Sequence, residues 1–204
     1  MKFNSPNMIT ILRVIISPVF YLLFTSGNAL SIRIAFWLFL LGAFTDYLDG
    51  WFARHYEETT NWGVFFDPLA DKILTTAAFL AFAHLGVVQW WMVIVIFVRD
   101  IGTTLLRIQA DSRKSILATS KSAKWKTFFQ LLFIIYILTL FFLKSSDVSL
   151  VSTVSLNNLI YSNFTFYIML GLTLFTIWTA IEYVYQNKSL FKPFKNTSNA
   201  DQQL

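Results

Sequence analysis

The fold class is indicated most clearly by Ile73–Phe97, which reads ILTTAAFLAFAHLGVVQWWMVIVIF and contains no Asp, Glu, Lys or Arg. A helix needs about 20 mostly apolar residues to span a bilayer. The connector His84–Gly86 divides this stretch between two predicted membrane helices. Thr127–Leu143 is also free of charged residues and predicts another. The pattern therefore indicates a helical membrane protein.

Along the whole chain, six apolar segments predict transmembrane helices. The expected fold class is therefore all-α integral membrane. The segments are Ile9–Thr25, Ser31–Phe52, Phe65–Leu85, Trp90–Gln109, Thr127–Leu143 and Phe164–Tyr185. The chain of 204 residues is 56% hydrophobic and only 13% charged, which leaves too few polar residues for a second, soluble domain. We expect one membrane domain over residues 1–195 and a polar, disordered tail over residues 196–204.

The basic residues predict the orientation in the membrane. Lys and Arg are concentrated between residues 107 and 126 and again in the tail, whereas the loops after the first and third predicted helices have none. Because cytoplasmic loops carry an excess of Lys and Arg, we expect both termini on the cytoplasmic side of the cell membrane. The net charge of +5 is explained in this way, without a nucleic-acid partner. The absence of cysteine excludes a disulfide framework, a thiolate zinc site and Cys nucleophilic catalysis.

Four aspartates interrupt the apolar pattern near the predicted cytoplasmic side. Asp46 and Asp49 are three residues apart, and Asp67 and Asp71 are four apart, so each pair shares a face of a helix. The two helices follow one another and are joined by a short loop, so the pairs are expected to meet at one end of the bundle. Four facing carboxylates repel unless protons or cations intervene. Oxygen ligands of this kind suit Mg²⁺ or Mn²⁺.

The residues around these aspartates indicate that a phosphate group binds beside them. Gly50, Ala53 and Gly63 are small, which lets a ligand approach the backbone closely. Arg54 offers a planar fork of donors that matches a phosphate. The set therefore predicts a diphosphate site. The alternative is a buried ion-pair network between helices.

The stretch Asp46–Asp71 resembles the signature of the CDP-alcohol phosphotransferase family, D-x2-D-G-x2-A-R-x8-G-x3-D-x3-D, and every specified position is matched. The resemblance implies six transmembrane helices, a homodimer and a cavity that faces the cytoplasm. It implies two Mg²⁺ or Mn²⁺ ions bound by Asp46, Asp49, Asp67 and Asp71. It further implies that Asp71 is the catalytic base. The residues that it implies for binding the CDP-lipid are Asn7, Thr10, Gly50, Ala53, Arg54, Thr60 and Gly63.

Other segments resemble the bacterial phosphatidylglycerophosphate synthases within this family. They are Asn4–Arg13, Phe66–Lys72, Arg99–Asp100 with Arg107, and Lys124–Thr127, although Asp100 stands where that subgroup usually has Glu and Ala123 where Gly is frequent. This resemblance implies transfer of a phosphatidyl group from CDP-diacylglycerol to sn-glycerol 3-phosphate, with release of CMP. The candidates for binding the acceptor phosphate are Arg99, Arg107, Lys124 and Lys126. These four could instead contact lipid headgroups.

Several alternatives stay open at this point. The same chemistry could use phosphatidylglycerol, giving cardiolipin, or inositol phosphate or serine as the acceptor. A protein of another class, a cation transporter, could use the four aspartates as its ion site. Lys72 follows Asp71 but lies about 100° away around a helix, so we expect its side chain to extend toward the membrane surface.

Overall fold

The computed structural model describes residues 5–56, 61–112, 121–146 and 152–187, and for residues 5–10, 46–56, 61–71 and several positions between 107 and 121 it gives the backbone alone. Within these residues the chain forms six long helices and one short helix, with no strand. They are α1 (Ser5–Thr25), α2 (Ala29–Tyr56), α3 (Asn61–His84), α4 (Trp90–Ser112), α5 (Lys121–Ser145), α6 (Thr153–Ile160) and α7 (Asn163–Gln186). The expected all-helical fold is confirmed, and each of the six apolar segments coincides with one long helix.

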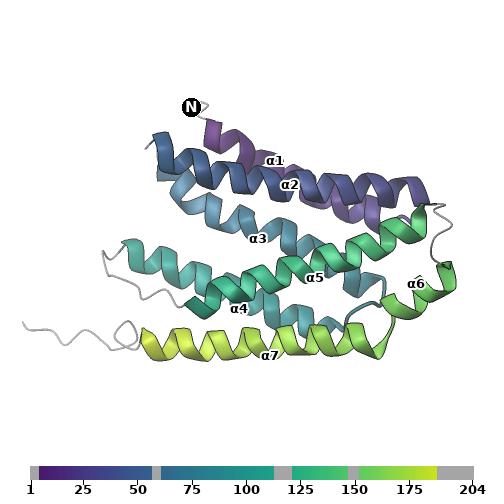
Figure 1. Cartoon of the computed structure of the whole chain (residues 1–204). Helices are drawn as coiled ribbons and strands as arrows, with labels where there is room; N and C mark the ends of the chain where they lie inside the picture. The colour runs from purple at the N-terminus through teal and green to yellow at the C-terminus, as the bar shows by residue number, and fades with distance from the viewer. Residues whose placement is uncertain (1–4, 57–60, 113–120, 147–151, 188–204) are drawn as a thin grey trace, which may run out of the picture.

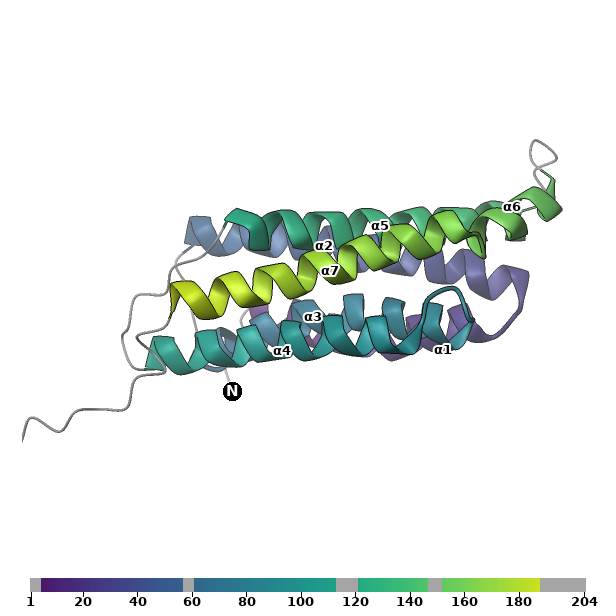
Figure 2. The same ribbon diagram turned by 90° about the horizontal axis from the view of Figure 1, so that it is seen from below.

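The long helices run antiparallel in one elongated bundle (Figure 1). α1 packs against α2 and α3, and α4 packs against α3 and α7. α5 contacts α2, α6 and α7. Seen from below, α2 and α5 lie along one side of the bundle and α1, α3 and α4 along the other (Figure 2). One end of the bundle holds the starts of α1, α3 and α5 and the ends of α2, α4 and α7. We call it the motif end.

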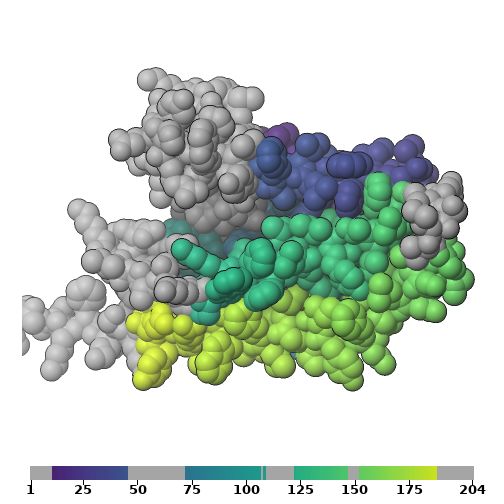
Figure 3. All heavy atoms as spheres, in the orientation of Figure 1, coloured from purple at the N-terminus to yellow at the C-terminus, as the bar shows by residue number. Residues whose placement is uncertain are grey.

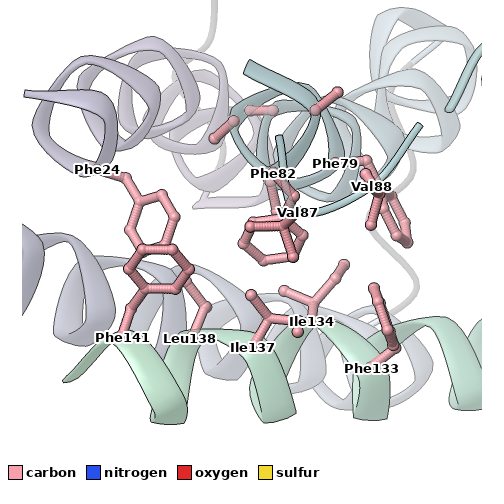
Figure 4. Packing of buried hydrophobic residues seen from close by; sticks show 14 of the residues in the cluster. Phe24, Phe79, Phe82, Val87, Val88, Phe133, Ile134, Ile137, Leu138 and Phe141 are labelled. Carbon is pink, nitrogen blue, oxygen red and sulfur yellow. The ribbon is translucent and has the colours of Figure 1, made fainter. Parts of the chain in front are cut away.

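Aromatic side chains from several helices pack together in the buried core (Figure 4). The ring of Phe24 lies 5.7 Å from that of Phe82 and 5.0 Å from that of Phe141, which joins α1, α3 and α5. Phe79 stacks on Phe133 at 6.3 Å. Lipid tails are as apolar as these side chains, so close packing rather than escape from water holds such helices together. The core therefore fixes the helices that extend to the motif end.

Large apolar side chains also cover the outside of the bundle. Trp37, Phe44 and Trp178 are 57%, 59% and 64% exposed. The face formed by α2, α5 and α7 is continuous in the space-filling view (Figure 3). In the described residues, Ser122–Ser145 and Thr153–Gln186 are long and apolar enough to cross a membrane by length and composition. Apolar exposure on this scale is typical of a surface that faces lipid or a partner, and it fits a membrane protein.

Gly42 provides a test of the packing between α1, α2 and α3. A Cβ atom at Gly42 would lie 2.8 Å from Cδ2 of the buried Leu74 and 3.7 Å from Cγ2 of Ile16. We expect Gly42→Val to destabilise the protein by about 1–3 kcal/mol, because the extra methyl groups overpack this contact. Gly171→Val is the matched control, since nothing lies within 4 Å of a Cβ there. Thermal unfolding in detergent measures both, and equal midpoints would contradict the packing.

Candidate active site

The aspartate motif occupies the facing ends of α2 and α3. Asp46 and Asp49 lie in the second half of α2, and Asp67 and Asp71 lie in the first half of α3. Both segments are helical at these positions, as the three- and four-residue spacings require. Because α2 and α3 are antiparallel and consecutive, all four positions lie toward the motif end (Figure 1). The side chains themselves lie outside the described residues, so their arrangement around a metal ion stays a prediction.

The remaining motif positions gather at the same end. Gly50, Ala53 and Arg54 lie in the last two turns of α2, and Gly63 lies in the first turn of α3. Asn7 and Thr10 lie in the first two turns of α1, which packs against both helices. Thr60 lies outside the described residues, as does the predicted tail. The backbone therefore brings three separate segments of the chain to one place.

The chemistry of the donor set fits a hard divalent cation. Four carboxylates on two neighbouring helices supply only oxygen ligands, which Mg²⁺ and Mn²⁺ prefer. Among the side chains that the structure describes, no other group of three His, Cys, Asp or Glu could hold a metal. The aspartate motif is accordingly the metal-binding candidate in this chain.

A buried ion pair lies beside the motif, on α4 and α5. Lys126 on α5 is fully buried, and its ammonium group donates a hydrogen bond to the carboxylate of Asp100 on α4. Nη1 of Arg99 lies 3.2 Å from the same carboxylate oxygen. Lys72 on α3 is close enough to interact electrostatically with Asp100. Among the described side chains, one carboxylate thus interacts with three cations.

The structure separates the four candidates for the acceptor phosphate. Arg99 and Lys126 meet at Asp100, whereas Lys124 is exposed. The side chain of Arg107 lies outside the described residues. The positive charges of Arg99 and Lys126 suit an anionic group of the substrate. Lys126, however, already donates a hydrogen bond to Asp100.

Sequence reasoning missed two polar residues in this region. Asp100 entered only as a departure from the subgroup pattern, yet it joins α4 to α5. Gln130 lies one turn after Lys126 and is 4% exposed. Its Nε2 has no hydrogen-bond partner among the described residues. The four-residue spacing of Lys126 and Gln130 was the available signal, because it places both on one face of a helix.

Comparison with known proteins shows which family this chain resembles over most of its length. The family model for CDP-alcohol phosphatidyltransferase matches residues 3–181. A probable phosphatidylglycerophosphate synthase of Mycobacterium tuberculosis strain H37Rv is 37% identical over 130 residues, which cover 62% of this chain and 62% of that protein.

Two further relatives carry the name CDP-diacylglycerol–glycerol-3-phosphate 3-phosphatidyltransferase. The Bacillus subtilis protein is 34% identical over 143 residues, covering 64% of this chain and 74% of the relative. The Mycoplasma genitalium protein is 31% identical over 172 residues, which cover 82% of this chain and 69% of the relative. The aligned residues thus cover less than two thirds of the length of the mycobacterial relative and more than two thirds of the length of the other two.

Proposed function

The chain belongs to the CDP-alcohol phosphatidyltransferase family, and on that basis we propose that it transfers a phosphatidyl group from CDP-diacylglycerol to sn-glycerol 3-phosphate. The products are phosphatidylglycerophosphate and CMP. The observation that carries the proposal is the complete eight-residue motif, whose positions the fold gathers at one end of the bundle. The relatives whose names specify glycerol 3-phosphate support this choice of acceptor. The transporter alternative loses its support, because the family is one of transferases.

We place the motif end at the cytoplasmic surface of the cell membrane. Six long antiparallel helices then cross the bilayer, with both termini and the active-site cavity on the cytoplasmic side. Arg107 near the end of α4 and Lys121, Lys124 and Lys126 near the start of α5 lie at the motif end, as the positive-inside tendency predicts for a cytoplasmic surface. A homodimer is part of the proposal through the family resemblance.

In the proposed site, Asp46, Asp49, Asp67 and Asp71 hold two Mg²⁺ or Mn²⁺ ions. When bound, such ions neutralise negative charge on the diphosphate oxygens. Arg54 donates hydrogen bonds to the diphosphate, while Gly50, Ala53 and Gly63 let the CDP group approach the backbone. Asn7, Thr10 and Thr60 complete the binding of the CDP-lipid.

Asp71 accepts the proton of the acceptor hydroxyl, as a general base does. The hydroxyl oxygen then forms a bond to the phosphorus on the lipid side of the diphosphate. The bond from that phosphorus to the bridging oxygen breaks, and CMP leaves with the electron pair. No covalent bond to the protein is needed, since the acceptor attacks directly.

The positive charge around Asp100 provides the acceptor site. Arg99 lies beside Asp100 and directs Nη1 toward its carboxylate. The Nε of Arg99 has no hydrogen-bond partner among the described residues. We propose that Arg99 contacts the phosphate of glycerol 3-phosphate, together with Arg107 and Lys124. Lys126 contributes charge from its buried position.

An acceptor panel tests this assignment. We expect CMP release with glycerol 3-phosphate and little with inositol or serine. Arg99→Gln should raise the KM for glycerol 3-phosphate by about 10- to 100-fold, because a hydrogen bond to a charged group is lost. Lys144→Gln, at the opposite end of α5, is the control and should leave the KM unchanged. A preference for phosphatidylglycerol, inositol phosphate or serine would keep the family chemistry and overturn the proposed acceptor.

A further inference from the structure

Asp100 holds two cations through one oxygen atom. Its carboxylate lies on α4, and the residue is 6% exposed. Oδ1 accepts a hydrogen bond from the Lys126 ammonium on α5, and Nη1 of Arg99 lies 3.2 Å from the same oxygen. Lys126 alone offsets the single charge of Asp100. Among the described side chains, Arg99 is therefore not needed to compensate this carboxylate.

The contact with Asp100 sets the direction of the Arg99 side chain. The two residues are adjacent on α4, so their side chains leave the helix about 100° apart. A long basic side chain on a membrane helix commonly extends along the apolar surface toward the headgroups. Arg99 instead bends around α4 to Asp100, and only 10% of its side chain is exposed. The carboxylate thus holds the guanidinium inside the bundle.

Arg99 keeps donors for a second anion. A guanidinium has five N–H donors and no acceptor. Nη1 is directed at Asp100, whereas Nε is buried and has no hydrogen-bond partner among the described residues. The edge of a guanidinium that carries Nε can form two parallel hydrogen bonds with a phosphate. A phosphate on that edge would satisfy a buried donor that is costly to leave unpaired.

A purely structural role for Asp100 is the alternative. In that role it would join α4 to α5 through Lys126 and would affect only the stability of the bundle. The contact with Arg99 is not needed for this, because Arg99 and Asp100 belong to the same helix. That contact adds no link between helices, but it does fix where the guanidinium lies.

We propose that Asp100 is a positioning residue of the acceptor site, whose carboxylate holds the Arg99 guanidinium in the orientation that binds the phosphate of glycerol 3-phosphate. Asp100 acts through Arg99 and does not itself contact the substrate. Lys126 compensates the charge of Asp100 so that Arg99 is left for the phosphate. The inference deepens the proposed function and rests on it, because glycerol 3-phosphate must be the acceptor.

The test is the steady-state kinetics of CMP release by the purified full chain in detergent. Asp100→Leu alone would leave the Lys126 ammonium buried without an acid, so the variant combines Asp100→Leu with Lys126→Met. Its KM for glycerol 3-phosphate should rise roughly 10-fold or more, because the displaced guanidinium no longer forms its charge-assisted hydrogen bonds. Its KM for CDP-diacylglycerol should stay unchanged. Asp100→Asn with Lys126→Met is the second variant and should show the same division between the two KM values.

A positioning role has a further signature in combination with Arg99→Gln. Added to the pair Asp100→Leu with Lys126→Met, Arg99→Gln should raise the KM for glycerol 3-phosphate by no more than about twofold. The effects are not additive because Arg99 has already lost its orientation in the pair. Asp100→Glu keeps the carboxylate and should keep this KM within about threefold of the unaltered value, since rescue needs only an acid that reaches Arg99.

The matched control removes one acid and one lysine elsewhere. Lys144 lies in the last turn of α5, at the opposite end from Lys126, and Asp147 follows two residues after that helix. The pair Asp147→Leu with Lys144→Met should leave both KM values within about twofold of those of the unaltered protein. Thermal unfolding in detergent checks that every variant is folded.

Three results would overturn the inference. In the first, a folded pair without Asp100 and Lys126 keeps the KM for glycerol 3-phosphate. In the second, the KM values for both substrates rise together, which is the result of a general disturbance of the site. In the third, Arg99→Gln has its full effect in the pair, which would show that Arg99 acts without Asp100. If the unaltered protein released no CMP in response to glycerol 3-phosphate, the proposed function would fail and the inference with it.

Discussion

Replacing Asp67 by Asn is expected to reduce CMP release from CDP-diacylglycerol by roughly 10³-fold or more. Asp67 is one of four proposed metal ligands, and the metal ions contribute several kcal/mol of charge stabilisation in the transition state. The substitution preserves the size of the side chain while removing its charge. The fold should therefore survive, because the two side chains have nearly the same shape. The measurement is the rate of CMP release at saturating Mg²⁺, with thermal unfolding as the check on folding.

Glu58→Gln is the matched control for this experiment. Glu58 lies between the two halves of the motif, at a position the signature leaves unspecified. Removing its charge should leave the rate within a factor of a few. If Asp67→Asn retained the activity of Glu58→Gln while remaining folded, the metal assignment would be wrong.

The second large effect is expected at the buried ion pair. Lys126→Met leaves the Asp100 carboxylate buried with Arg99 as its remaining described partner. Removing one member of a buried pair costs about 3–5 kcal/mol, and here the buried carboxylate loses its hydrogen-bonded ammonium and keeps Arg99 alone as an ion-pair partner among the described residues. For a chain of this size, the unfolding midpoint should fall by roughly 6–20 °C. Thermal unfolding in detergent provides the value.

The double variant Lys126→Met with Asp100→Leu should regain most of this loss. Both charges are then absent, and a double-mutant cycle isolates their coupling. Lys124→Met, two residues away and exposed, should change the stability by no more than about 0.5 kcal/mol. Equal stabilities for Lys126→Met and Lys124→Met would contradict the ion pair. A folded double variant that is still active would show that Lys126 positions its neighbours rather than binding the acceptor directly.

The spacing of the aspartate motif was sufficient to predict the family, and the match over residues 3–181 confirms it. Length and hydropathy also located the six long helices, because an apolar run of about 20 residues is a strong signal. The apolar pattern defined the polar ends of the helices less well. α2 continues past Phe52 to Tyr56, and α6 was missed because its eight residues, with Asn157 and Asn158 among them, form no long apolar run.

The contacts between helices could not be predicted from one sequence. Spacing shows that Lys126 and Gln130 share a face of α5, but not that this face meets Asp100 on α4. The cavity that Pro18 and Ala77 help to line likewise depends on how α1, α3 and α4 pack together. The arrangement of the four aspartate side chains stays a prediction, as do the six membrane crossings and the homodimer.

We propose that this chain joins a phosphatidyl group to glycerol 3-phosphate. The most direct test supplies the purified protein with CDP-diacylglycerol, Mg²⁺ and ¹³C-labelled sn-glycerol 3-phosphate, and follows CMP and the lipid product by mass spectrometry. We expect equal amounts of CMP and of a diacyl lipid that carries two phosphates and the label. CMP release without acceptor, or a folded protein that binds CDP-diacylglycerol but leaves glycerol 3-phosphate unlabelled in the lipid, would contradict it.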